Sequence, residues 1–143
     1  MVEVAMELKL LAATPYIEEL VATALLTTST DSAPSRIFAR IKKSPEQVKG
    51  LLRGLPLQHG SILEHNRICW LFKASDSETL ELLLSSRFFT VSRIEEGVWL
   101  LSANLRTLVE YLTSGQSAGR DELARTLSAL APIIHGCLEM KTG

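Results

Sequence analysis

Cysteine, histidine and aromatic residues are scarce in this chain of 143 residues, and each scarcity excludes a class of protein. Two cysteines, Cys69 and Cys137, are too few for the disulfide framework of a small secreted domain. Together with three histidines they do not supply the short ligand spacings of a zinc site. We therefore expect no metal and free thiols, with Cys69 acting as a small buried hydrophobe inside an apolar run.

The chain also lacks an excess of charge of one sign and a long apolar run. Fifteen lysines and arginines oppose sixteen aspartates and glutamates, and this balance is not typical of a general nucleic-acid binder or a polybasic membrane protein. No apolar stretch reaches the roughly 18 residues of a membrane span. Charged side chains within residues 1–11 are not typical of a secretory signal, so we expect a cytoplasmic protein.

What is present is the composition of a globular protein. Hydrophobic residues make up 46% of the chain and charged residues 22%, which excludes disorder as the main state. A chain of this length has room for one hydrophobic core, so residues 1–143 are predicted to form a single domain.

The first half of the chain predicts one strand and two helices. Apolar and polar residues alternate over 2–10, which indicates a strand with one buried face. Thr14 and the proline after it are expected to open a helix through Ala24, and the Ser/Thr-rich segment 27–35 is expected to be a loop. Ser44 is expected to cap a second helix that ends at Gly54.

The second half predicts a central strand, a hairpin and three helices, in an order without regular strand–helix–strand alternation. We therefore predict an α+β fold, a small antiparallel sheet packed with helices. Trp70 and Trp99 are expected to pack on the sheet with their N–H groups bonded. The predicted elements are a strand over 67–73, a helix opened by a Ser75–Glu78 capping box, a hairpin of 88–94 and 98–101, a helix over 103–112, and a helix over 120–130 that continues past a kink at Pro132.

Segment 59–65 is the most informative part of the chain. It reads His-Gly-Ser-Ile-Leu-Glu-His, so two imidazoles, a hydroxyl and a carboxylate lie within seven residues. The simplest interpretation is a capping box between Ser61 and Glu64, with both histidines on the surface. A metal site is disfavoured, because His59 and His65 are not at the i, i+4 spacing of a helical pair.

Several separated segments, taken in order, carry a resemblance to a known family. Segment 59–65 supplies a histidine, a serine and a glutamate-histidine pair, and segment 6–15 supplies a strand followed by Thr-Pro. Segment 102–108 reads Ser-Ala-Asn-Leu-Arg-Thr-Leu, an Asn-x-Arg-x-Leu helix start, and segment 122–124 reads Glu-Leu-Ala. This set is similar to the motifs of the flavin-dependent thymidylate synthases.

The resemblance implies an activity and a site. The family methylates dUMP to dTMP, with FAD reduced by NADPH as hydride carrier and methylene-tetrahydrofolate as carbon donor. FAD would bind to His59, Ser61 and Glu64, while Asn104 and Arg106 would hold its other parts, from a neighbouring subunit. Imidazole, hydroxyl and guanidinium groups suit the ribityl chain and pyrophosphate of this cofactor.

The resemblance also implies a homo-oligomer, a tetramer in the family. We expect apolar residues of the helix over 103–112 to pack between subunits, because a small monomer covers such a face poorly. The residues are Leu105, Leu108, Val109 and Leu112.

The chain departs from the family at the nucleotide site. The family has an Arg-His-Arg signature after the helix that follows the central strand, whereas segment 84–93 reads Leu-Ser-Ser-Arg-Phe-Phe-Thr-Val-Ser-Arg. Arg87 is the remaining candidate for substrate binding, a family nucleotide-binding arginine falls at Gly115, and active members are longer. We therefore expect a weakened nucleotide site. The alternative is a non-catalytic flavin- or nucleotide-binding oligomer on the same scaffold.

A basic run lies between residues 36 and 53, where six cations oppose a single acid, Glu46. The simpler interpretation is a solvated helix face, and the alternative is an anion patch near the phosphates of the flavin or nucleotide. Phe38 is the single aromatic residue in this run, so no nucleic acid is expected as partner. The cations are Arg36, Arg40, Lys42, Lys43, Lys49 and Arg53.

Overall fold

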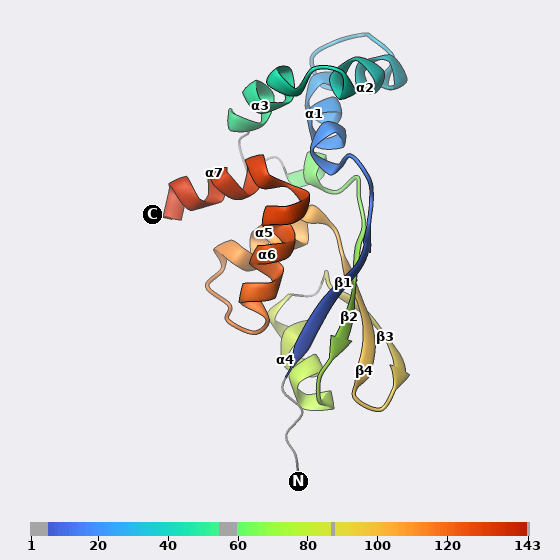
Figure 1. Ribbon diagram of the computed structural model, residues 1–143, viewed down its shortest axis with the longest axis vertical. Coiled ribbons are helices and arrows are strands. Elements are labelled where there is room, and N and C mark those ends of the chain that lie inside the picture. Colours follow the sequence, from blue (N-terminus) through green and yellow to red (C-terminus); the bar gives the residue numbers. More distant parts are fainter. Residues whose placement is uncertain (1–5, 55–59, 87, 143) are drawn as a thin grey trace.

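The computed structural model describes residues 6–54, 60–86 and 88–142 and shows a sheet with helices on one side and a helical extension at one end (Figure 1). The elements are β1 (Glu7–Ala13), α1 (Ile17–Thr27), α2 (Pro34–Lys42), α3 (Pro45–Arg53), the 3-10 helix η1 (Gly60–Leu63), β2 (Ile68–Lys73), α4 (Asp76–Ser85), β3 (Thr90–Glu95), β4 (Val98–Ala103), α5 (Leu105–Thr113), α6 (Arg120–Leu130) and α7 (Pro132–Thr142).

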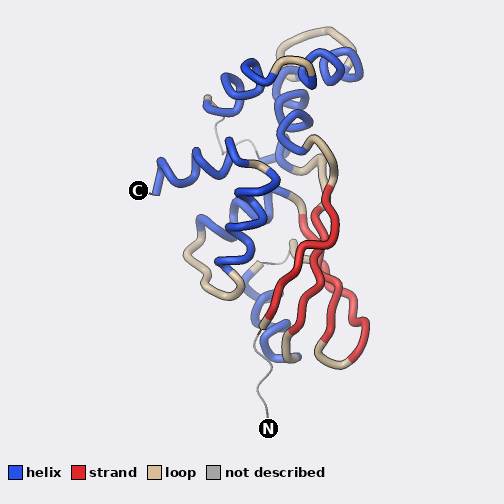
Figure 2. Tube along the Cα trace, in the orientation of Figure 1, coloured by secondary structure: helices blue, strands red, loops and turns tan. Residues whose placement is uncertain are grey.

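The four strands form one antiparallel sheet in the order β1-β2-β4-β3 (Figure 2). The segment predicted as the central strand is β2, and the predicted hairpin is β3–β4 with its turn at Glu96–Gly97. Helices and a small antiparallel sheet therefore make an α+β fold, as predicted. Among the described residues, no helix is long and apolar enough to cross a membrane.

One face of the sheet carries the core. Trp70 and Phe72 on β2 and Leu101 on β4 are fully buried, and the residues between them are not. The indole N–H of Trp70 donates to the hydroxyl of Thr126 on α6 at 3.0 Å, which ties the sheet to the helix that covers it. Trp99 donates its N–H to the carbonyl of Ala74 at 3.3 Å. Both predicted indole hydrogen bonds are confirmed.

The helix starts were predicted with mixed success. The capping box of Ser75 and Glu78 is present at α4, where each residue binds the backbone of the other. Ser44 begins α3 without a side-chain capping bond. Thr14 does not cap α1, because its hydroxyl accepts from the backbone N–H of Arg67 at 2.8 Å. The helix begins instead at Ile17, after Tyr16, whose backbone lies in the left-handed region.

Segment 27–35 is not a loop throughout, because α2 begins at Pro34. This helix has no side-chain cap at Ala33 and buries only Ile37 and Ile41, one turn apart. Such a short amphipathic pattern gives a weak sequence signal. Downstream, α6 and α7 meet at Ala131 and Pro132, which confirms the kink predicted there.

The apolar face of α5 belongs to the core of this chain. Leu105 and Leu108 are completely buried, and Val109 and Leu112 are nearly so. These residues therefore do not offer a surface for packing between subunits, contrary to the expectation drawn from their spacing. Cys69 and Cys137 are free thiols, and Cys69 is half-buried on β2 because it faces away from the core.

Candidate functional site

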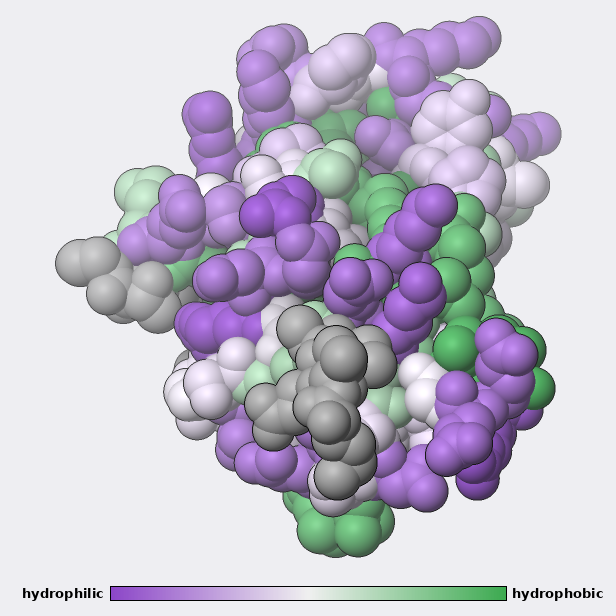
Figure 3. All heavy atoms as spheres, turned by 60° about the horizontal axis from the view of Figure 1, so that its bottom comes forward, coloured by the Kyte–Doolittle hydropathy of each residue, from purple (hydrophilic) through white to green (hydrophobic). Residues whose placement is uncertain are grey.

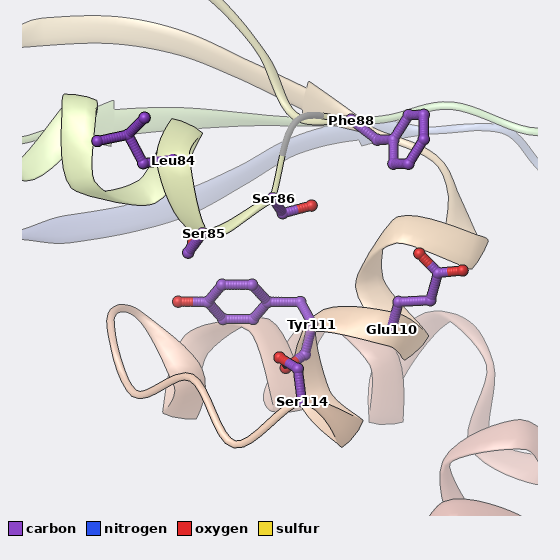
Figure 4. Close-up of a pocket in the computed structure, with 7 residues that line it drawn as sticks. All are labelled: Leu84, Ser85, Ser86, Phe88, Glu110, Tyr111 and Ser114. Carbon is purple, nitrogen blue, oxygen red and sulfur yellow. The ribbon is translucent and has the colours of Figure 1, made fainter.

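A cleft of about 390 Å³ lies between the C-terminal end of α4 and the exposed side of α5 (Figure 4). This volume falls in the range of small-molecule sites. The lining mixes hydroxyl groups with apolar side chains and includes one carboxylate. It is made by Leu84, Ser85, Ser86, Phe88, Glu110, Tyr111 and Ser114.

Tyr111 forms the buried wall of the cleft. Its ring packs edge-on against Phe89, with ring centroids 5.6 Å apart, and its hydroxyl donates to the carbonyl of Ala118. Burial raises the pKa of Tyr111 above its ordinary value. The phenol of Tyr111 is therefore held in a fixed position and stays protonated at neutral pH, so it does not act as a general base.

The mouth of the cleft holds groups that suit a polar, planar ligand. Ser86 makes no side-chain hydrogen bond with any other described residue, and its hydroxyl faces the cleft (Figure 4). Phe88 is 52% exposed and lines the cleft with an aromatic ring on the side of β3. The hydroxyls of Ser85 and Ser114 donate to carbonyls of their own helices, which leaves that of Ser86 as the donor for a ligand. A hydroxyl donor beside an aromatic ring is suited to a sugar and a heterocyclic base.

Beside the cleft, an ion network joins Glu64, the residue directly after η1, to the first two turns of α5. A guanidinium N–H of Arg106 donates to Glu64 at 2.6 Å, and the Nε of Arg106 donates to Glu110 at 3.0 Å. These two carboxylates raise the pKa of Arg106 above its ordinary value, Glu64 more than Glu110. Two carboxylates around one guanidinium leave the group with a net charge of −1.

The structure brings Glu64 and Arg106 together from positions 42 residues apart. Ser61 lies exposed on η1, one turn before Glu64. Asn104 is the N-cap of α5, and its side-chain oxygen accepts from the backbone N–H of Thr107 at 2.9 Å. His59 and Arg87, the other two predicted site residues, lie outside the described residues.

The capping box proposed for Ser61 and Glu64 is not formed. The carboxylate of Glu64 accepts from Arg106. The contact between the two residues is a backbone bond, in which the N–H of Glu64 donates to the carbonyl of Ser61 at 3.2 Å.

Sequence reasoning missed Asn66, which joins η1 to α5 through two hydrogen bonds. Its side-chain oxygen accepts from the backbone N–H of Leu105 at 2.7 Å, and its amide donates to the carbonyl of Leu63 at 2.9 Å. It also missed Glu110 and Tyr111, which follow Arg106 by four and five residues. A tyrosine on the otherwise aliphatic face of this helix was the available signal.

The described residues do not form a ready site for the pyrophosphate of FAD. Arg106, the cation assigned to that role, is engaged by two carboxylates, and the network repels an anion until one of them is displaced. Within the described ranges, no three His, Cys, Asp or Glu side chains are grouped to hold a metal ion.

The basic run lies on α2 and α3, with all six of its cations exposed. These helices occupy the end of the molecule opposite α4 (Figure 1). The simpler interpretation, a solvated helix face, therefore agrees with the structure, and the alternative of an anion patch beside the cleft is not met within one chain.

No protein-family description and no curated protein sequence matches the chain. Among solved structures, the chain is similar to a UMP/dUMP methylase, PolB from Streptomyces cacaoi, in a crystal structure with bound 5-Br dUMP. The TM-score is 0.67 at 12% sequence identity, over 96% of this chain and 96% of that chain. At this identity the likeness shows the fold alone. The coverage also shows that this chain is not short beside that methylase.

Proposed function

We propose that the chain is a nucleotide methylase of the flavin-dependent thymidylate synthase type, acting on a uridine monophosphate with FAD as cofactor. The FAD pyrophosphate would contact Arg106 only by displacing Glu64 or Glu110. The observation that carries this proposal is the match of the whole fold to a UMP/dUMP methylase, with no large part of either chain left over. The cleft supports it, because its wall includes the segment after α4 where the resembling family has its nucleotide signature.

The residues of the cleft would bind the base and the sugar. Phe88 would stack on the pyrimidine ring, and the hydroxyl of Ser86 would face the ribose. The hydroxyl of Ser114 donates to the carbonyl of Tyr111 at 2.8 Å, so it would only accept from the sugar. Base–aromatic stacking contributes about 1–3 kcal/mol, so Phe88 would supply much of the affinity. Tyr111 fixes the depth of the cleft, because its hydroxyl is held by Ala118.

The nucleotide phosphate is the weak point of this site. The described lining contains a carboxylate, Glu110, and no cation. Arg106 would contact a phosphate only after releasing Glu64 or Glu110. We therefore expect weak nucleotide binding and slow turnover, with Arg87 as the first cation to test.

The second candidate is a binding protein without catalysis on the same scaffold. The network of Glu64, Arg106 and Glu110 favours it. A guanidinium that binds two carboxylates of its own chain stabilises the fold and is not available to bind the phosphate of a substrate. In this case the cleft would bind a nucleotide or flavin, with no methyl transfer.

One set of experiments separates the two candidates. Purified protein is titrated with UMP, dUMP and FAD, and is then assayed with FAD, NADPH and methylene-tetrahydrofolate for a methylated uridine nucleotide by mass spectrometry. Product supports the enzyme, whereas binding without product supports the second candidate. Phe88→Ala is expected to weaken nucleotide binding about tenfold. Leu80→Ala, at a similarly exposed residue outside the cleft, serves as the control. Absence of binding by all three ligands would refute both candidates.

A further inference from the structure

A polar cluster lies at one end of the open face of the sheet, the face that carries no helices. Cys69 on β2 pairs with Ser102 on β4, and Ser102 pairs with Thr90 on β3, so one row of residues crosses three strands. Paired residues on neighbouring strands share a face, as do residues two apart along one strand. Arg67 comes two residues before Cys69, and its side chain lies across Ser102 and Thr90.

Hydrogen bonds hold the guanidinium of Arg67 in position. Its Nη2 donates to the hydroxyl of Thr90 and to the hydroxyl of Ser102, each at 3.0 Å. Its backbone is held as well, because its N–H donates to the hydroxyl of Thr14 at 2.8 Å and its carbonyl accepts from the N–H of Thr14 at 2.9 Å. The guanidinium is therefore ordered before any ligand binds, which lowers the entropic cost of binding.

No described carboxylate neutralises the charge of Arg67. Among the residues that the structure describes, Arg106 and Arg125 form ion pairs, whereas Arg67 forms none. Hydroxyl groups orient a guanidinium but carry no negative charge. Arg67 therefore differs from Arg106, whose two carboxylate partners repel an anion, and keeps its full positive charge for one.

The cluster also keeps hydrogen-bond donors for a ligand. A hydroxyl that accepts from an N–H still has its own O–H to donate, and neither Thr90 nor Ser102 donates that O–H to another described residue. The N–H groups of Nε and Nη1 of Arg67 are likewise not used within the described part of the chain. A positive guanidinium beside two hydroxyl donors is the chemistry with which proteins bind phosphate oxygens.

The open face next to the cluster is apolar. Leu100 precedes Ser102 by two residues, is 37% exposed, and pairs with Leu71 on β2. Figure 3 shows hydrophobic side chains along the right-hand side of the molecule, where Figure 1 places the sheet. Inorganic phosphate gains nothing from such a surface, whereas the organic part of a phosphate ester would remove some of it from water. An organic phosphate therefore fits this place better than inorganic phosphate.

The cluster lies near the cleft. Thr90 follows Phe88 by two residues, so their Cα atoms are within about 7 Å of each other. The cleft is on the helical side of the sheet and the cluster is on the open side, with the edge strand β3 between them. A ligand that extends from the cleft around this edge would place a phosphate at Arg67.

We propose that Arg67, Thr90 and Ser102 form a binding site for the phosphate group of an organic phosphate. The guanidinium supplies the charge, and the two hydroxyls donate to phosphate oxygens. The nucleotide and FAD are the two sources of this group under the proposed function, and the choice between them rests on that function, whereas the phosphate site does not. Because the site is open to water, we expect a Kd on the order of 1 mM for inorganic phosphate.

The first test is protection of Arg67 from phenylglyoxal, a reagent that modifies arginine side chains. The extent of modification is measured residue by residue by mass spectrometry, with phosphate replacing chloride at constant pH and ionic strength. Arg36, an exposed arginine on α2 without a described hydrogen-bond or ion-pair partner for its side chain, is the control within the same molecule. Phosphate should protect Arg67 at a concentration at least about tenfold lower than it protects Arg36. Equal protection of the two arginines overturns the proposal.

The second test removes the two hydroxyls and leaves the arginine. In the double variant Thr90→Val with Ser102→Ala, phosphate should protect Arg67 no better than it protects Arg36, because the hydroxyl donors are gone and the guanidinium is no longer held. Ser92→Ala removes a hydroxyl from the same strand, two residues from Thr90, and should leave the protection unchanged. Circular dichroism checks that each variant is folded. Protection of Arg67 in the folded double variant at the wild-type phosphate concentration overturns the proposal, since the hydroxyls then have a structural role alone.

The same assay identifies the source of the phosphate. UMP is compared with uridine and FAD with riboflavin, so that each pair differs in its phosphate groups. The organic phosphate that belongs here should protect Arg67 at a lower concentration than inorganic phosphate does, and its phosphate-free partner should not protect. Protection by inorganic phosphate, with UMP and FAD no better, supports the phosphate site and counts against the proposed function. Absence of protection by inorganic phosphate, UMP and FAD overturns the site.

Discussion

Glu18 is a buried carboxylate that joins the first and last helices, and it should make the stability of the protein depend on pH. It lies in the first turn of α1, is 6% exposed, and accepts a hydrogen bond from the backbone N–H of Ile134 in α7 at 3.0 Å. Burial raises the pKa of Glu18 from 4.5 to about 7, although the N–H groups of Ile134 and Ile133 oppose this shift.

The sign of the effect follows from proton binding. Between pH 4.5 and 7 the folded protein holds a proton on Glu18 that the unfolded chain has released, so the free energy of unfolding decreases as the pH rises. A pKa difference of this size corresponds to about 3 kcal/mol, fully lost above pH 7. Glu18→Gln keeps an oxygen for the N–H of Ile134 and removes the titration.

The measurement is urea unfolding, followed by tryptophan fluorescence, at several values between pH 5 and 8. Wild type and Glu18→Gln should be similarly stable at pH 5, and the variant should be more stable at pH 8 by up to about 3 kcal/mol. Glu19→Gln, the neighbouring change on the same helix, should preserve the wild-type pH dependence. A difference between wild type and Glu18→Gln that is constant from pH 5 to 8 would refute this account of Glu18.

Three further predictions concern the backbone and the site. Gly119→Ala should destabilise the fold by about 1–2 kcal/mol in thermal or urea unfolding, because its φ is +65° and an added Cβ would lie 2.9 Å from a side-chain carbon of Leu8. Ser75→Ala should lower the free energy of unfolding by about 1 kcal/mol through loss of the α4 capping box, without changing ligand binding in a titration. Glu110→Gln should strengthen the binding of a nucleotide monophosphate at low salt, measured by calorimetry, because it removes one of the two carboxylates that hold Arg106. Unchanged or weaker binding in this variant would show that Arg106 does not reach the phosphate.

The parts of the fold that the sequence predicted are those with strong local signals. The hairpin followed from two apolar runs around Glu95, Glu96 and Gly97, and α4 followed from a capping box four residues long. The short helix α2 was missed, because Ala33 gives no capping signal and two buried isoleucines give almost no periodicity. Local patterns fix an element only where several of them agree.

The site was less predictable, because its contacts join distant segments. The pair of Glu64 and Arg106 is separated by 42 residues, and Thr14 meets Arg67 across 53. A sequence shows which residue types are available, but a local pattern cannot show which partner a carboxylate chooses. The motif around Ser61 and Glu64 was therefore open to two interpretations, a helix cap and a cofactor contact. The observed ion pair of Glu64 and Arg106 excludes the helix cap, and the cofactor contact stays a prediction.

The position of Glu110 links the two parts of the site. It lines the cleft and also holds Arg106, which in turn holds Glu64, so a ligand that entered the cleft with a phosphate would compete with both carboxylates for the same guanidinium. All three groups are partly exposed, and exposed ion pairs are weak enough to exchange for a stronger, doubly charged partner. A phosphate must therefore displace a carboxylate before it binds Arg106, and this displacement costs free energy. A neutral nucleoside makes no such contact and has no such cost. Comparing the affinities of uridine and its monophosphate would test this contact directly, since a nucleoside that binds as tightly as the nucleotide places the phosphate outside the reach of Arg106.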